Sequence, residues 1–247
     1  MLSIVDDLAG FGPLRVCAHA QSADDPDDLT GLRVLLVADV LARVAELRGR
    51  TVLIGWTCPP VAAADAAGIR PADAHGTVEE ITEALGGSPT VHLTSRTYEG
   101  AAGLSLHVGE AATTPDADPG ADAGQEEGRD ALALRLLLLG RPHHEPVDVS
   151  ARSVDAAAEQ LANWRRSVAA WADEPSKAMP AELVERAHAA LENGLDTAAV
   201  VRLLGGLETV ADVPAGAKFE TFAHLDRVLG LEVVRDVGRS HSAELYR

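Results

Sequence analysis

The first sixty residues contain a strand, a helix and a second strand, and this order constrains the fold more than any other feature of the sequence. Leu14–Ala18 is a short apolar run that predicts a buried strand, and Thr51–Ile54 predicts a second strand with β-branched residues. Between them, Leu32–Arg48 repeats apolar residues at spacings of three to five, which is typical of a largely buried helix ending at Gly49. A strand–helix–strand unit joins parallel strands, so the sequence predicts an α/β fold.

The next part of the chain continues this alternation. Thr77–Glu80 has the Thr-x-x-Glu form of a capping box, which predicts a helix that ends near Leu85. Val91–Leu93 and Leu104–Val108 predict two further strands, and the second alternates apolar and polar residues as a half-exposed strand does.

Residues 110–130 have a different composition from the rest of the chain. They include seven acidic residues, one arginine and no large apolar side chain, so burial cannot offset the entropy of ordering them. We therefore expect residues 1–109 to form one domain, residues 110–130 a flexible acidic linker, and residues 131–247 an all-helical domain. Five candidate helices make up that last part: Ala131–Leu139, Ser153–Ala172, Ala181–Asn193, Thr197–Gly205 and Lys218–Leu229.

The charge and the cysteine count exclude several classes of protein. The net charge is −17 and only two of the 21 basic residues are lysines, so neither nucleic acids nor anionic membranes are expected partners. Two cysteines, Cys17 and Cys58, cannot build a disulfide framework or a four-cysteine zinc site. The first residues have no basic stretch of the kind a secretory signal begins with, and no apolar run could span a bilayer. We expect a cytoplasmic protein.

Short segments along both ends of the chain occur in an order known from other proteins. They are Leu14–Cys17, Val37–Arg43, Gly49–Val52, Leu134–Leu138, Pro146–Ser150, Leu161–Arg165, Leu191–Ala198, Lys218–Phe222 and Leu225–Leu231. Together these segments resemble cysteinyl-tRNA synthetase and the related mycothiol-pathway cysteine ligase. The resemblance implies a truncated Rossmann-like parallel sheet of the nucleotidylyltransferase type, followed by an all-helical bundle domain.

The signature motifs of these families are missing. Asp28–Gly31 stands where the His-Ile-Gly-His signature is expected, so both imidazoles that stabilise charge on the α-phosphate are absent. The Lys-Met-Ser-Lys-Ser loop would fall between Val108 and Ala131, in the acidic segment. The family zinc site uses two cysteines, a histidine and a glutamate, of which only Cys17 has a counterpart, so no metal site is expected.

These departures favour a catalytically degenerate synthetase-like protein that acts as a binding or regulatory module and does not aminoacylate tRNA. The alternative is a ligase or acyltransferase that uses ATP or an aminoacyl-adenylate and acts on a small acceptor or a carrier protein. The sequence assigns no cofactor and no catalytic residue. It leaves open a small-molecule ligand, a protein partner and homo-oligomers.

Six residues are candidates for contact with a ligand. Cys17 and His19 form a Cys-x-His pair that could ligate a metal, although the favoured interpretation is a small buried strand residue beside a loop histidine. His107 closes a strand at the carboxyl end of the predicted sheet, where α/β proteins bind ligands. The complete set is Cys17, His19, Thr30, Gly31, Arg96 and His107.

Overall fold

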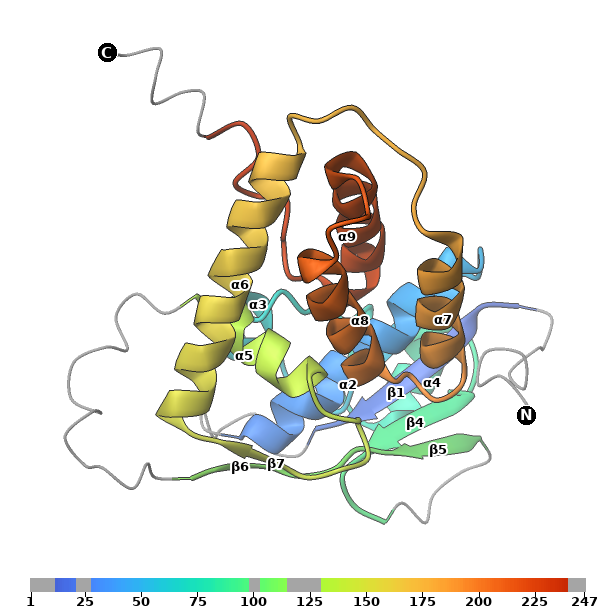
Figure 1. Ribbon diagram of the computed structural model, residues 1–247. Coiled ribbons are helices and arrows are strands. Elements are labelled where there is room, and N and C mark those ends of the chain that lie inside the picture. The colour runs from blue at the N-terminus through green and yellow to red at the C-terminus, as the bar shows by residue number, and fades with distance from the viewer. Residues whose placement is uncertain (1–11, 21–27, 98–102, 115–129, 240–247) are drawn as a thin grey trace.

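The main sheet has five parallel strands, and β1 lies at its centre (Figure 1). The computed structural model describes residues 12–20, 28–97, 103–114 and 130–239. The strand order is β3-β2-β1-β4-β5, which confirms the predicted α/β fold with a parallel sheet. The strands are β1 (Leu14–His19), β2 (Val52–Trp56), β3 (Ala74–His75), β4 (Val91–Thr94) and β5 (Leu104–His107).

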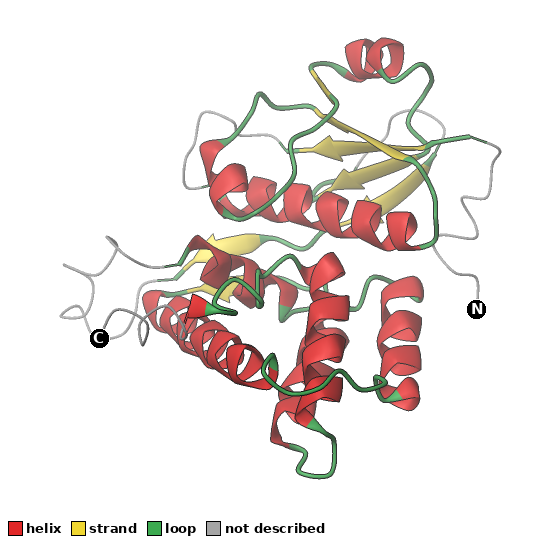
Figure 2. Ribbon diagram, turned by 90° about the horizontal axis from the view of Figure 1, so that it is seen from above, coloured by secondary structure: helices red, strands yellow, loops and turns green. Residues whose placement is uncertain are grey.

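The helix after β1 lies between the sheet and the helical half of the chain that follows residue 130 (Figure 2). This helix, α2 (Leu29–Leu47), is buried along most of its length because its apolar residues face the sheet on one side and the helical half on the other. The other helices are α3 (Ala62–Ala66), α4 (Val78–Ala84), α5 (Ala131–Leu139), α6 (Ala151–Trp171), α7 (Ala181–Glu192), α8 (Thr197–Thr209) and α9 (Ala215–Leu229). Among the described helices, none is both long enough and apolar enough for a bilayer crossing.

The opposite face of the sheet is covered in part by α4. Thr77 caps this helix in the predicted capping box, in which its hydroxyl accepts from Glu80 N–H and the Glu80 carboxylate accepts from Thr77 N–H. Ile81 of α4 packs directly over Gly55 of β2, at a position where a side chain would collide with it. The close approach places α4 beside the central strand β1.

The segment expected to be a linker begins with a strand. Ala111–Thr113 (β6) pairs in parallel with Val147–Val149 (β7) to form a second, two-stranded sheet. Thr30 holds this strand against the start of α2, because its hydroxyl donates to the Ala111 carbonyl and accepts from the Ala111 N–H, both at 3.0 Å. The expectation of a flexible loop is therefore wrong for residues 111–113, because strand β7 and the Thr30 side chain supply hydrogen bonds from positions distant in sequence. Residues 115–129 lie outside the described residues.

The two parts predicted as separate domains share one hydrophobic core. A continuous cluster of buried residues extends from the sheet through α2 into α5, α6, α8 and α9. Asp39 of α2 lies within this region and accepts from Arg135 of α5 at 2.8 Å, and both side chains are at most 1% exposed. Arg135 also donates to the carbonyls of Leu229 and Ala67, so one guanidinium joins three distant segments.

Candidate functional site

The order of the strands creates a topological switch point between β1 and β4. From β1 the chain runs outward through β2 to β3, then returns to pair β4 with the other side of β1. Open α/β sheets bind ligands at the carboxyl ends of the strands beside such a point. The residues at the carboxyl ends of β1 and β4 are therefore the strongest candidates for a ligand-binding site.

One face of the sheet is polar at this point. Cys17 and His19 of β1 lie opposite His92 and Thr94 of β4, and side chains two residues apart share a face. On β5, Ser105 lies opposite His92, and His107 lies opposite Thr94. We call these six residues the polar face: Cys17, His19, His92, Thr94, Ser105 and His107.

Within the polar face, Cys17, His19 and His92 form a compact group. Nε2 of His19 and Nδ1 of His92 lie 3.0 Å apart, and the two rings stack with centroids 5.2 Å apart and an angle of 26° between their planes. Each of the three side chains offers one ligand atom, and these atoms all lie within 4.8 Å of one another. Cys17 and His92 are buried, whereas His19 is only half-buried.

All three groups are uncharged at neutral pH. Burial raises the pKa of the Cys17 thiol to about 12. Burial, with a smaller contribution from His92, lowers the pKa of His19 to about 4, and burial also lowers the pKa of His92. In the contact between the imidazoles, one ring therefore donates an N–H and the other accepts it with a lone pair. Neutral imidazoles are the form that binds metal ions or accepts protons.

The structure places the predicted site residues in three different positions. Cys17, His19 and His107 share the polar face, with β4 between His107 and His19. Thr30 and Gly31 belong to α2, which packs against the other face of the sheet, so the structure separates them from Cys17. Arg96 follows β4 with an exposed side chain, and its backbone N–H donates to the Thr94 hydroxyl.

His92 belongs to the group but was not predicted. It is the one histidine in the apolar segment Val91–Leu93, and a polar residue at the centre of a predicted strand was the available signal. Placing it beside Cys17 required the register between β1 and β4, which local patterns do not contain.

The start of α2 is closed by a carboxylate of the chain itself. A helix N-terminus after the first strand of such a sheet commonly binds phosphate, because its free N–H groups and its dipole favour an anion. Here the Asp28 side chain accepts from the Gly31 N–H at 2.9 Å. A Cβ at position 31 would lie 2.3 Å from Asp28 Oδ2, so the glycine leaves room for the carboxylate.

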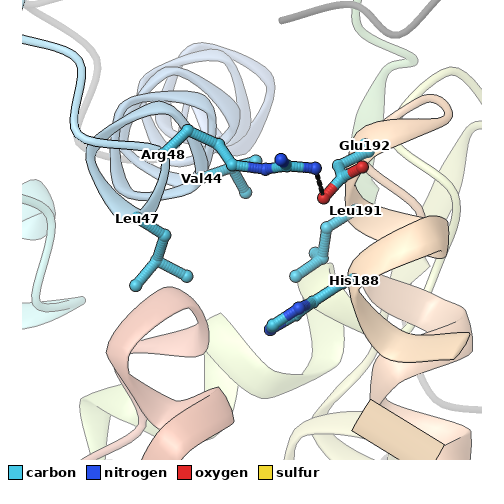
Figure 3. Close-up of a pocket in the computed structure, with 6 residues that line it drawn as sticks. All are labelled: Val44, Leu47, Arg48, His188, Leu191 and Glu192. Carbon is cyan, nitrogen blue, oxygen red and sulfur yellow. Dashed lines mark ion pairs between the residues drawn. The ribbon is translucent and has the colours of Figure 1, made fainter. Parts of the chain in front are cut away.

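A pocket with a volume of about 260 Å³ lies between the C-terminal ends of α2 and α7 (Figure 3). An ion pair between Arg48 and Glu192 crosses it, and His188 on its wall contacts His224 of α9 with their Nε2 atoms 3.0 Å apart. Its charged side chains already neutralise each other, and no residue predicted as a ligand contact lines it. The polar face is therefore the stronger candidate.

No protein-family model matches the chain, and no curated protein matches it. The resemblance to cysteinyl-tRNA synthetase remains a hypothesis, and we infer the function from the geometry of the sheet and of α2.

Proposed function

We propose that this chain is a synthetase-like binding module that does not activate an amino acid with ATP. The observation that supports this most directly is the Asp28 carboxylate at the N-terminus of α2. A phosphate at this position would meet a negative charge and would have to displace the bond to Gly31. A nucleotide-binding end of a helix has the opposite requirement, since its N–H groups must stay available.

Two basic side chains of the described residues, Lys218 and Arg33, are engaged in packing contacts with backbone carbonyls. Lys218 donates to the Glu208 carbonyl at 2.9 Å and lies over the ring of Trp171, within the helical half. Arg33 of α2 is buried, and it donates to the carbonyls of Gly109 and Pro142 at 3.1 and 2.9 Å. These cations stabilise the packing of distant segments, which supports a structural role for them.

The proposed ligand is a small molecule that binds at the polar face. His19 and His107 offer polar contacts there, and Ser105 and His107 of β5 are exposed, so part of the face is open to a ligand. Such a surface suits a neutral or metal-binding ligand better than a triphosphate.

The test is a thermal-shift series with ATP, AMP, cysteine and a nonhydrolysable cysteinyl-adenylate, together with an assay for AMP formation from ATP and cysteine. We expect no AMP, and no stabilisation by ATP or AMP, because a ligand that binds the native state raises the melting temperature. The variant Asp28→Asn, which keeps a neutral cap, serves as a matched comparison. Production of AMP by the wild-type chain would overturn the proposal.

One observation favours the alternative of a ligase or acyltransferase. His19 is a half-buried imidazole at the carboxyl edge of the sheet, and its pKa of about 4 keeps it unprotonated at neutral pH, although it also makes the ring a weaker base than an ordinary histidine. If the chain transfers an acyl group, His19→Gln and His107→Gln should each reduce turnover by about 100-fold or more. Turnover that is unchanged in both variants would exclude this role for the two histidines.

A further inference from the structure

We propose that Cys17, His19 and His92 form a binding site for a zinc-type transition-metal ion at the switch point of the sheet. This inference goes beyond the proposed function, and it differs from the expectation, based on the sequence, that the chain has no metal site. It depends on two histidines that have no counterpart in the zinc ligand set of the families the sequence resembles.

The backbone explains why these three side chains converge. Cys17 and His19 are two residues apart on β1, so they project from the same face, and His92 lies directly opposite Cys17 on the neighbouring parallel strand. Strands in a sheet hold such neighbours at a fixed spacing, and a site built on strands needs little reorganisation to bind.

The distances are close to those of a metal centre. Zinc–nitrogen and zinc–sulfur distances place two nitrogens about 3.3 Å apart, and a nitrogen and a sulfur about 3.6 Å apart, in a tetrahedral site. The two imidazole nitrogens are already 3.0 Å apart, and all three ligand atoms lie within 4.8 Å of one another. Side-chain rotations that bring the ligand atoms closer to one another by about 1 Å would therefore complete the tetrahedral geometry.

The ligand types select the kind of ion. One thiolate and two imidazoles suit Zn²⁺, Co²⁺ and copper, whereas Mg²⁺ and Ca²⁺ prefer carboxylate and carbonyl oxygens. On binding, the Cys17 thiol loses its proton to water and the sulfur bonds to the metal. The ring that donates the N–H in the metal-free contact moves that proton to its other nitrogen through solvent, so both imidazoles then give a lone pair and stay neutral. The reaction releases one proton, from the thiol, and changes no oxidation state.

The surroundings leave one side of the site open. Ile81 of α4 and Leu85, the residue after that helix, pack with Cys17 in a small apolar cluster, which shields the sulfur. His19, at the end of β1, is only half-buried, so the ion would be reached from the carboxyl edge of the sheet. Three protein ligands with an open fourth position are typical of sites that also bind a water molecule or a small ligand.

The experiment uses the full-length chain without a histidine tag, treated with a chelator and then titrated with Co²⁺ under reducing conditions. We expect one Co²⁺ per chain, with the charge-transfer absorption of a thiolate bound to cobalt, and displacement of Co²⁺ by Zn²⁺ but not by Mg²⁺. His19→Gln and Cys17→Ser should each weaken binding by about 100-fold or more, and Cys17→Ser should remove the charge-transfer band.

Two controls separate this site from unspecific binding. Cys58→Ser removes the other buried cysteine, and His75→Gln removes an exposed histidine on β3; both should bind Co²⁺ as the wild type does. Because Cys17 is in the core, His19→Gln at the half-buried strand end is the variant that decides if Cys17→Ser fails to fold. The proposal is overturned if the wild type lacks the stoichiometric band, or if His19→Gln binds Co²⁺ as tightly as the wild type.

Discussion

Asp39 of α2 and Arg135 of α5 form an ion pair at 2.8 Å in which neither side chain is more than 1% exposed. Burial by itself would raise the pKa of Asp39, but Arg135 and Arg43 outweigh it and hold that pKa below its ordinary value. The pair joins the layer next to the sheet to the helical half, which the sequence predicted as separate domains.

Asp39→Asn should lower the free energy of unfolding by about 3–5 kcal/mol, because it leaves a buried guanidinium without its counter-charge. Urea unfolding followed by the fluorescence of the buried Trp56 and Trp164 measures the change. Arg48→Ala is the matched control, since it breaks an ion pair to Glu192 in which the arginine side chain is 52% exposed. It should cost less than about 1 kcal/mol, and equal effects of the two variants would contradict the argument.

Gly31→Ala should destabilise the chain, although alanine ordinarily stabilises a helix by up to about 1 kcal/mol relative to glycine. The added Cβ would lie 2.3 Å from Asp28 Oδ2 and would displace the cap, whose loss costs about 0.5–2 kcal/mol. In an Asp28→Ala background the collision is gone, so the same substitution should become neutral or stabilising. A double-mutant cycle by urea unfolding measures this coupling, and additive effects would show that the contact is unimportant.

Stability should fall in mild acid partly because of His143. Burial, with smaller contributions from His144 and Arg33, lowers the pKa of His143 to about 4. Between about pH 6.5 and 4 the unfolded chain binds a proton that the folded chain does not, so this residue's contribution is complete above pH 6.5 and is lost as the pH falls. The loss is about 1.4 kcal/mol per pH unit in that interval.

His143→Gln should reduce the slope of unfolding free energy against pH by about that amount. Urea unfolding at several values between pH 6.5 and 4.5 provides the comparison. Identical slopes for His143→Gln and the wild type would be evidence against a buried neutral imidazole.

Gly55 and Gly205 should respond to alanine in opposite ways. A Cβ at position 55 would lie 2.3 Å from Cγ2 of Ile81, which is fully buried, so Gly55→Ala should cost about 1–3 kcal/mol through overpacking. Gly205 lies within α8 with no atom near its would-be Cβ, so Gly205→Ala should stabilise by about 0.5–1 kcal/mol. Thermal unfolding of both variants is sufficient, and a loss of stability in Gly205→Ala would contradict the prediction.

Local patterns predicted most of the regular structure. The apolar spacing in Leu32–Arg48 and the capping box at Thr77 depend on residues within a few positions of one another, and the structure confirms both helices within a few residues. The short elements α3 and β3 were not predicted, because their alanine-rich sequence has no clear period. Strand β6 was missed because the groups that bond to it, strand β7 and the Thr30 side chain, are distant in sequence.

The sequence likewise predicted only part of the candidate site. Cys17 and His19 could be paired from the sequence, since their separation by two residues on a strand already implies a shared face. His92 could not be added, because the pairing of β4 with β1 follows a return across the sheet that no local signal specifies. Arg33 is a similar case, since its carbonyl partners at Gly109 and Pro142 depend on tertiary packing.

The burial of α2 on two sides has a consequence for dividing the chain. A fragment that ends before residue 115 would retain a 19-residue helix with an uncovered apolar side, and a fragment that begins at residue 130 would lack the surface against which α5 and α9 pack. Neither piece should be a stable, soluble protein by itself. Mixed together, the two should recover a joint fold, so the chain is a natural candidate for reconstitution from two separately expressed parts.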